Sequence, residues 1–511
     1  MSKKIAHTVT RNTGLLLGLG GIALLVLQLG TTVAQSPFWF WTALLAMLVG
    51  GGLFSLGQYQ GTVAGIKNDG VWFNPLTNKG LWGWLLGIVL TAFYILLYFY
   101  PEVLGYNSQG QSTGLIAFFD PLSYALNGKA ATQWFVYGTL YTLAILIFGL
   151  KFMLKYRGNR YQLIKTGANI FFQLGFAFLL PELLAKLNGD SPYFAKDLKN
   201  MWPLNYYFFE DWHLDAMASG GTLGKLMLGS GVLMIFVVSP LLTYRFGKRW
   251  YCSWVCGCGA LAETAGDPFR QLSSTKISVW KFERWMIHAV LVFVCVTTLA
   301  VLWTYTAAAD NALGWSQQYL WYFSLVLLGG TLLFLRGYYG KQLPKDAQYA
   351  AYSTLIVLLF AVGLRGWNGS EPLFGISSYQ LRSWYGFGVG AVFSGVLGVG
   401  FYPLLGSRVW CRFGCPMAAI LGLQQRLFSR FRITTNGGQC ISCGNCSTYC
   451  EMGIDVRAYA QKGENIVRSS CVGCGICSSV CPRGVLRLEN GPVAGRTATQ
   501  KLEAFVKTTT A

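Results

Sequence analysis

The sequence predicts an all-α polytopic membrane protein, with about ten transmembrane helices and a small α+β domain at the C-terminal end. Three observations support this fold class. First, 53% of the 511 residues are hydrophobic and only 12% are charged, which is about half the charged share of a soluble globular chain. Second, ten apolar stretches approach the roughly 20 residues that a membrane-spanning helix needs. Third, a polar, cysteine-rich segment follows the last of these stretches.

The ten expected membrane spans begin close to the N-terminus. The first apolar run is longer than the 7–15-residue core of a signal peptide, so we expect a retained transmembrane helix there. The expected spans are 13–34, 38–57, 80–100, 134–153, 167–186, 223–243, 286–305, 318–336, 349–366 and 385–406.

The basic residues predict how these spans are oriented. With the N-terminus in the cytoplasm and every span crossing, 33 of the 40 Lys and Arg residues lie in cytoplasmic segments, as the positive-inside rule requires. We therefore expect a multi-pass protein of the bacterial inner membrane with both termini in the cytoplasm. The same distribution explains the formal net charge of +20, so lipid is an expected partner and nucleic acid is not.

Composition divides the chain into four expected regions. Residues 1–222 form an N-terminal transmembrane region of about five helices, and residues 223–435 form a second transmembrane region with two Cys-x3-Cys motifs. Residues 436–490 form the cysteine-rich domain. The last region, 491–511, is polar and basic and is expected to be loosely ordered.

Thirteen of the 14 cysteines gather in four short clusters, a spacing typical of metal ligands rather than of disulfides in a large membrane chain. Two of these clusters follow the spacing C-x2-C-x2-C-x3-C, and Pro482 follows the second. This is the pattern of bacterial two-cluster ferredoxins, in which the fourth cysteine of each run binds the other cluster. The segment 436–490 is therefore expected to be a two-cluster ferredoxin-like domain.

The pattern assigns four cysteines to each of two [4Fe–4S] clusters. Zinc is the alternative, but zinc sites usually pair two C-x2-C hooks rather than repeat a run of four cysteines. Glu451 stands where a proline often follows the fourth cysteine. The expected ligands are Cys440, Cys443, Cys446 and Cys481 for the first cluster, and Cys450, Cys471, Cys474 and Cys477 for the second.

The other two clusters of cysteines form an internal repeat at cytoplasmic helix ends. Each follows a Pro-Leu-Leu sequence, then a basic and an aromatic residue, and then Cys-x3-Cys. This spacing would place two thiols one helical turn apart on one face, and we expect the two ends to lie close together. Four thiolates could then hold a third centre, either iron–sulfur or another metal, whereas the alternative is two pairs of free thiols. The candidate ligands are Cys252, Cys256, Cys411 and Cys415, with Cys258 as an extra candidate.

Paired Cys-x3-Cys motifs after membrane helices, followed by a two-cluster ferredoxin segment, resemble the NapH- and NosR-type membrane polyferredoxins. They are also similar to the related cytochrome-oxidase assembly factors that reduce copper. The resemblance covers roughly residues 235–485. Cys411-x3-Cys415-Pro416 fits the family motif fully, whereas Gly257 replaces the proline after Cys256. The resemblance implies electron transfer between quinol or another donor and a metalloprotein, or the maturation of such a protein.

We therefore expect a membrane-bound electron-transfer protein that exchanges electrons with quinone or with a partner protein, as a subunit of a quinol-linked oxidoreductase. The first alternative is a factor that reduces a metal for insertion into a respiratory enzyme. The second is an ion pump driven by the clusters, which few buried ionisable residues support. The chain has only three histidines and no C-x-x-C-H motif, so the sequence gives no support for haem.

Overall fold

The computed structural model describes residues 2–29, 36–60, 79–109, 111–187, 208–307, 311, 313–334, 336–337, 348, 352–353, 355–360, 362–363 and 377–490. The chain divides into two compact units, which are described separately. The first unit comprises Met1–Lys199, Val237–Arg284 and Phe393–Ala511, and the second comprises Asn200–Phe236 and Trp285–Val392. The four sequence regions given above remain predictions.

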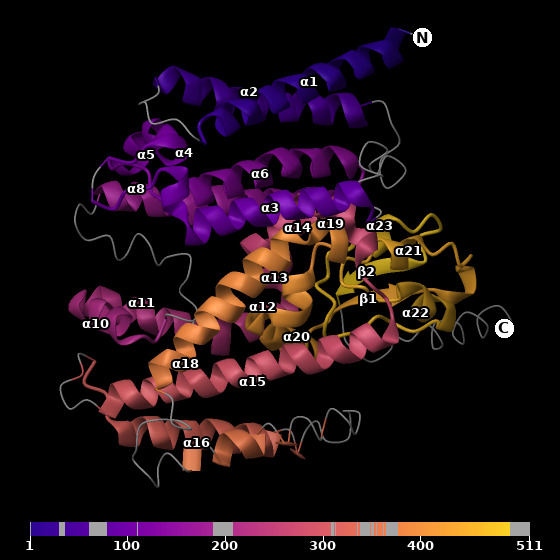
Figure 1. Cartoon of the computed structure of the whole chain (residues 1–511). Helices are drawn as coiled ribbons and strands as arrows, with labels where there is room; N and C mark the ends of the chain where they lie inside the picture. The colour runs from indigo at the N-terminus through magenta and orange to yellow at the C-terminus, as the bar shows by residue number, and fades with distance from the viewer. Residues whose placement is uncertain are drawn as a thin grey trace, which may run out of the picture. The chain divides into compact units, whose positions relative to one another are not determined.

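Long apolar helices dominate the N-terminal part of the first unit (Figure 1). Short helices and turns connect them on the way to the last one, which runs without interruption from residue 160 to residue 187. The elements are α1 (Ser2–Leu27), α2 (Pro37–Tyr59), α3 (Leu81–Phe99), η2 (Pro101–Leu104), α4 (Gly114–Phe118), α5 (Asp120–Asn127), α6 (Gln133–Lys155), α7 (Arg160–Ile170), η3 (Phe171–Leu179) and α8 (Leu180–Leu187).

Close packing of α1 on α2 depends on glycine. A Cβ atom on Gly14 would lie 2.7 Å from the carbonyl oxygen of Gly50, and one on Gly50 would lie 2.8 Å from the carbonyl oxygen of Gly14. Such backbone approach is typical of helix pairs in membranes. The outer side of α1 still exposes large apolar side chains such as Leu16, which is 72% exposed, and lipid is the solvent that suits them.

The rest of the first unit contains several short elements, some of which contact the N-terminal helices. The short elements are α12 (Ser239–Phe246), α13 (Trp250–Trp254), α14 (Gly257–Thr264), η5 (Asp267–Leu272), α19 (Tyr402–Leu405), η8 (Trp410–Gly414) and α20 (Pro416–Phe428). Three of them, α13, α14 and η8, contain a cysteine of the Cys-x3-Cys segments, and Cys256 and Cys415 precede α14 and α20. In Figure 1, α14 and α19 lie beside the same end of α3 and α6.

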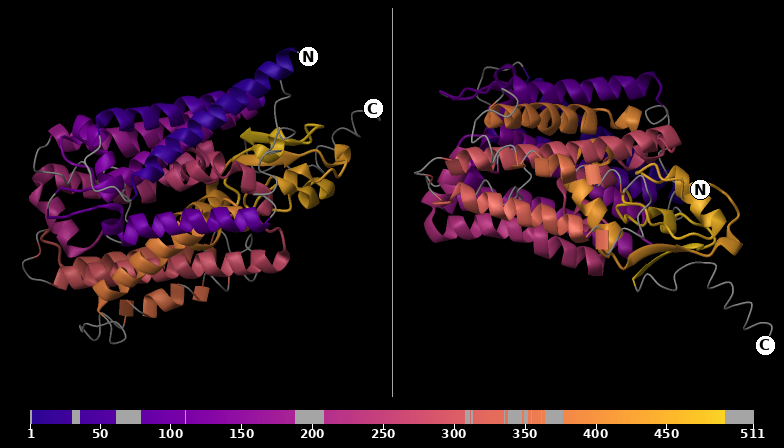
Figure 2. Two further views of the ribbon diagram at one scale, coloured as in Figure 1. Left: turned by 45° about the horizontal axis from the view of Figure 1, so that its top comes forward. Right: turned by 90° about the horizontal axis from the view of Figure 1, so that it is seen from below.

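The C-terminal domain is a two-stranded antiparallel sheet with short helices between its strands. Strand β1 (Phe431–Thr435) pairs with β2 (Leu486–Asn490) in the register Phe431↔Asn490 to Thr435↔Leu486. Between the strands lie η9 (Gly437–Gln439), α21 (Asn445–Thr448), α22 (Val456–Lys462) and α23 (Ile476–Ser479). Figure 2 shows this domain, in yellow, beyond one end of the N-terminal helices. The predicted small α+β domain is confirmed.

The second unit is helical in the part of the chain that the structure describes. Its elements are α10 (Asp211–Ser219), α11 (Gly221–Leu233) and α16 (Gln317–Phe334), together with the greater part of α15 (Ile277–Ala307), α18 (Ser378–Tyr385) and half of η7 (Gly386–Gly400); η4 (Met234–Val238) joins α11 to α12. Buried Arg382 of α18 donates hydrogen bonds to the hydroxyls of Thr297 and Thr298 on α15, at 3.3 and 2.8 Å.

Eight helices within the described residues are long and apolar enough to span a membrane. They correspond to eight of the ten predicted spans. The first lies at Ile5–Leu27 rather than at 13–34, because α1 begins earlier than predicted, among the polar residues near the N-terminus. The predicted span 318–336 corresponds to α16, which begins with two glutamines and is only 18 residues long. The predicted span 349–366 lies largely outside the described residues. A multi-spanning membrane protein is therefore supported, but the count of ten is not confirmed.

Candidate functional site

The first four predicted cluster ligands line one cavity near the protein surface. Cys440, Cys443, Cys446 and Cys481 surround a hollow of about 370 Å³, which includes its opening to solvent. Cys443 is exposed, and Ile441 beside it is 55% exposed. The structure thus brings together three cysteines of the first run and the fourth cysteine of the second run, as the spacing predicts.

The other four predicted ligands line a second, more buried cavity of about 360 Å³. Cys450, Cys471, Cys474 and Cys477 surround it, together with apolar side chains such as Ile466, which is fully buried. Burial raises the pKa of Cys450 to about 12. Thiolates at this depth therefore need a strongly positive partner such as iron.

The backbone repeats itself around the two cavities. Residues with positive φ occur two, four and thirteen positions after the first cysteine of each run. Gly444 (φ 81°) and Gly475 (φ 77°) each begin a one-turn helix that carries the third cysteine of its run. This left-handed conformation suits glycine, which explains why the Cys-Gly step occurs in both runs. The matching set is Ser442, Gly444 and Gly453 in the first run, and Gly473, Gly475 and Gly484 in the second.

The arrangement of thiols fits iron–sulfur clusters better than single metal ions. Across the residues that the structure describes, no group of three or more His, Cys, Asp or Glu side chains converges closely enough to hold one ion. A zinc site needs four ligands within about 2.3 Å of the metal. In a cubane each cysteine instead binds a different iron, so the four thiols surround a cavity, and four cysteines line each of the two hollows here.

The two Cys-x3-Cys pairs also come together, but not as two turns of one helix. Cys252 lies in α13, which ends at Trp254, and Cys256 is the residue that caps the N-terminus of α14. Cys411 lies in η8, and Cys415 caps α20 in the same way. The expectation that each pair lies on one helical face is therefore wrong, because a new helix begins directly after Cys256 and directly after Cys415. In the second pair, Pro416 begins the new helix and cannot continue the previous one.

The thiols of the two pairs influence one another. Cys252 and Cys411 are each only 3% exposed, and burial followed by the charge of Cys411 raises the pKa of Cys252. A hydrogen bond with Cys258 lowers the pKa of Cys256 to about 6, assisted by backbone N–H groups and by Arg408. The helix N-terminus at Cys256 also favours a thiolate there. Cys258, the extra candidate, thus belongs to the same set of thiols.

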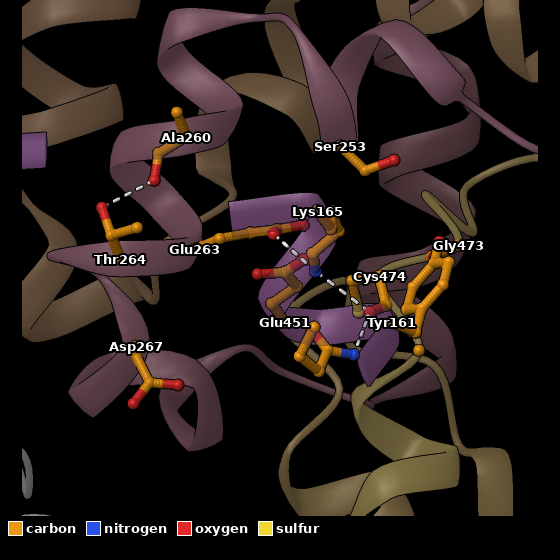
Figure 3. A network of polar contacts seen from close by, with 12 residues as sticks. Tyr161, Lys165, Ser253, Ala260, Glu263, Thr264, Asp267, Glu451, Gly473 and Cys474 are labelled. Carbon is orange, nitrogen blue, oxygen red and sulfur yellow. Dashed lines mark hydrogen bonds and ion pairs between the residues drawn. The ribbon is translucent and has the colours of Figure 1, made fainter. Parts of the chain in front are cut away.

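A fully buried network of charges lies between this set and the second cavity. Lys165 pairs with Glu263 at 2.6 Å, and Glu263 also pairs with Arg408 at 2.9 Å. Arg408 in turn reaches Glu451 at 3.0 Å, and Glu451 pairs with Arg270 at 2.9 Å. Figure 3 shows Lys165 between Glu263 and Cys474, with Glu451 close by. All these side chains are at most 1% exposed.

The charges of this network determine which carboxylates stay ionised. Asp267 pairs with Lys155 at 2.6 Å and with Arg270 at 2.8 Å, so the network holds four cations and three carboxylates. Burial opposes ionisation of Asp267, but the charges of Lys155 and Arg270 outweigh it and lower its pKa. For Glu263 the effect of burial outweighs that of the neighbouring cations, and its pKa is raised.

The N-terminal helices hold the loop of the second cavity. The Lys165 ammonium group donates to the carbonyl oxygen of Cys474 at 3.0 Å, as does the Gln162 amide at 2.7 Å. The Tyr161 hydroxyl donates to the carbonyl oxygen of Gly473 at 2.8 Å. All three residues lie on α7, so the first helices position this part of the ferredoxin-like domain.

Sequence reasoning missed most of this network. Glu451 did carry a signal, because it replaces an expected proline. The partners of Glu451 are distant in sequence, and no local pattern identifies them.

Comparisons with known proteins support the iron–sulfur assignment. Residues 229–277 and 387–434 each match one family model, described as a 4Fe-4S binding domain. Residues 439–486 match a second model, described as a 4Fe-4S dicluster domain. The double match of the first model agrees with the internal repeat of the Cys-x3-Cys motifs. The matched segments cover well under half of the chain.

One curated relative is similar over a short stretch. It is an Escherichia coli (strain K12) protein named "Putative electron transport protein YccM", 41% identical over 49 residues, which are 10% of this chain and 13% of that protein. The chain thus matches only a small part of that relative's length. No solved structure matches. Together the findings show ferredoxin-type iron–sulfur domains in a protein with many apolar helices, and they are consistent with electron transport.

Proposed function

We propose that this protein transfers electrons between two [4Fe–4S] clusters in its C-terminal domain and a third centre at the membrane edge. The third centre would be held by Cys252, Cys256, Cys411 and Cys415. One observation carries the proposal. Glu451, bonded through the chain to Cys450, pairs with Arg408, and a guanidinium nitrogen of Arg408 lies 3.8 Å from the Cys411 sulfur atom. Two side chains therefore join the second cavity to the membrane-edge thiols.

The exposure of the cysteines suggests an order along this route. Cys443 of the first cavity is exposed, so a soluble redox protein would exchange electrons there. The second cavity is lined by buried side chains, and Glu451 beside it pairs with Arg408 of the membrane-edge motif, so the proposed route runs from the first cavity through the second to the membrane-edge thiols. Each cluster, when bound, supplies a one-electron redox couple whose potential depends on burial, charge and hydrogen bonds. The chain supplies the thiolates, their spacing and the surrounding charges.

Quinone is the proposed partner at the lipid side, because the membrane-edge thiols adjoin apolar helices. Oxidation of two singly reduced clusters would supply the two electrons that convert one quinone, with two protons, into a quinol. The protein would then be the membrane subunit of a quinol-linked oxidoreductase in the bacterial inner membrane, with both termini cytoplasmic. The excess of Lys and Arg in the segments expected inside supports this orientation.

The experiment compares two oxidants acting on reduced protein in nanodiscs. Ferricyanide, which is water-soluble, should reoxidise the ferredoxin-type clusters of wild type and Cys411→Ser at the same rate. Decylubiquinone, which is lipid-soluble, should reoxidise those of Cys411→Ser about tenfold more slowly or worse. Cys295→Ser is the control, because Cys295 lies outside both cavities and outside the membrane-edge set. Equal rates with decylubiquinone in all three proteins would contradict the proposed route.

A further inference from the structure

Two arginines occupy the same position in the internal repeat. Arg249 stands three residues before Cys252, and Arg408 stands three residues before Cys411. Each follows a glycine with positive φ by two residues, and the two glycines have nearly identical backbone angles. Both side chains are buried, at 2% and 1% exposure. A buried guanidinium is costly unless anionic or carbonyl groups surround it.

Each arginine crosses to the other half of the repeat. A guanidinium nitrogen of Arg249 donates to the carbonyl oxygen of Cys411 at 3.2 Å. In the opposite direction, a guanidinium nitrogen of Arg408 donates to the carbonyl oxygen of Cys252 at 3.2 Å. The exchange is reciprocal, as expected for two copies of one motif related by an approximate twofold axis. It fixes the two Cys-x3-Cys pairs against each other.

Each arginine also holds the chain beside the second cavity. The Nε atom of Arg249 donates to the carbonyl oxygen of Ser469 at 2.9 Å, two residues before Cys471. Arg408 pairs with Glu451 at 3.0 Å, one residue after Cys450. Both guanidinium groups therefore lie between the membrane-edge thiols and two of the cysteines around the second cavity.

The two arginines differ in how their charge is balanced. Arg408 has two carboxylates, Glu263 and Glu451. Arg249 forms no ion pair with a carboxylate among the described residues, and its nearest polar partners are carbonyl groups. A buried cation with this surrounding fits an anionic centre made of thiolates.

We propose that Arg249 and Arg408 couple the membrane-edge centre electrostatically to the second ferredoxin centre. This inference rests on the proposed function, since it requires both centres. An electron added to either centre increases its negative charge, and the same two guanidinium groups stabilise it. Loss of either charge should therefore make both centres harder to reduce. The effect should be larger at Arg249, because two carboxylates already offset the charge of Arg408.

The test is a redox titration followed by electron paramagnetic resonance, on the full-length protein purified without oxygen. Arg249→Gln should lower the equilibrium constant for one-electron reduction of both centres about tenfold, which corresponds to about 59 mV. Arg408→Gln should also lower both equilibrium constants, but by a smaller factor. Arg249→Lys keeps the charge but loses the planar fork, so its two potentials should stay close to those of wild type even where its thermal stability falls.

Arg412→Gln is the matched control. Arg412 lies in the same motif and is 3% exposed, but its guanidinium pairs with Glu283 at 2.9 Å. Its loss should move neither potential to the same extent as Arg249→Gln. The proposal is overturned if only one centre shifts in Arg249→Gln, or if Arg249→Lys shifts the potentials as much as Arg249→Gln. If Arg249→Gln binds no iron, the same comparison is made with the other two variants. Arg408→Gln should then lower both potentials, and Arg249→Lys should leave both close to those of wild type. Wild type in which no third centre titrates besides the two ferredoxin clusters would refute the proposed function instead.

Discussion

Glu451 illustrates how a single residue can depart from a motif for a reason that lies elsewhere in the chain. A proline there would remove the carboxylate that Arg270 and Arg408 share, and would leave each arginine with one carboxylate partner, Asp267 and Glu263 respectively. The observed glutamate pairs with both, at 2.9 and 3.0 Å, and is fully buried. It therefore joins the ferredoxin-like domain to the membrane-edge motifs while leaving the ligand spacing unchanged.

Replacing Glu451 by Gln should destabilise the protein by about 3–5 kcal/mol, the usual effect of removing one partner of a buried ion pair. The thermal loss of visible iron–sulfur absorbance should then occur at a clearly lower temperature than in wild type. Glu464→Gln is the control, because Glu464 is exposed. Equal midpoints for Glu451→Gln and Glu464→Gln would show that the buried pairs contribute nothing to stability.

Asp267 should give a pH dependence of known sign. Its pKa is lowered in the folded protein because Lys155 and Arg270 outweigh the effect of burial. The folded state thus binds fewer protons there than the unfolded state, whose Asp pKa is about 3.9. The stability from Asp267 is present above that value and is lost as the pH falls through the lower, folded pKa.

The stability difference between wild type and Asp267→Asn should therefore shrink as the pH falls below about 4. Circular dichroism melting curves at several pH values would measure this difference. Asp120→Asn is an informative comparison, because burial raises the pKa of Asp120 and its pH dependence should have the opposite sign. A difference for Asp267→Asn that does not change with pH would contradict the account.

At the scale of elements, the cysteine spacing predicted more than the hydropathy did. The two ferredoxin runs predicted both sets of four cysteines that line the cavities, because each run is short and its geometry is local. Membrane helices were found from composition, but their ends were not. The sequence also predicted that the two Cys-x3-Cys pairs meet, yet it placed each pair on one helix, whereas the chain breaks before Cys256 and Cys415.

The buried charge network could not be predicted in the same way. Lys165, Glu263 and Glu451 are roughly a hundred or more residues apart from one another, and each looks like an ordinary cytoplasmic charge in its own segment. Only the packing of α7, α14 and the ferredoxin-like domain brings them together. Contacts of this kind depend on the tertiary fold and leave no periodic signal in the sequence.

The glycines that begin the repeated arginine motifs provide a test at this scale. Gly406 has φ 91°, and a Cβ atom there would collide with Ser273. Gly406→Ala should therefore destabilise the membrane-edge site by about 1–3 kcal/mol, the range for a strained non-glycine residue. Gly229→Ala is the control, because nothing lies within 4 Å of its added Cβ and its φ is not positive.

Thermal melting and iron content would be measured for both glycine variants. Gly406→Ala should melt at a lower temperature and lose iron from the membrane-edge centre first. Gly229→Ala should behave as wild type or be slightly more stable, since alanine favours a helix. If Gly406→Ala and Gly229→Ala melt at the same temperature, the left-handed turn before Arg408 has no importance for the stability of the site.

At the scale of the whole molecule, the first helices acquire a role that the sequence did not suggest. Three residues of α7 bind the loop of the second cavity through the carbonyl groups of Gly473 and Cys474. Phe152 and Tyr156, near the end of α6, pack against Ile476 and Val480 of the same domain. The N-terminal region therefore anchors the ferredoxin-like domain at one end of the membrane helices.

The central claim is that this chain holds iron–sulfur clusters both in its C-terminal domain and at the membrane edge. The most direct measurement is the iron, sulfide and zinc content of protein purified without oxygen, combined with spin quantitation after reduction. At four irons for each cubane, wild type should hold about twelve irons per chain and Cys252→Ser/Cys411→Ser about eight. Colourless protein, or zinc in place of iron, would contradict the claim. About eight irons in both proteins would remove the third centre from the account.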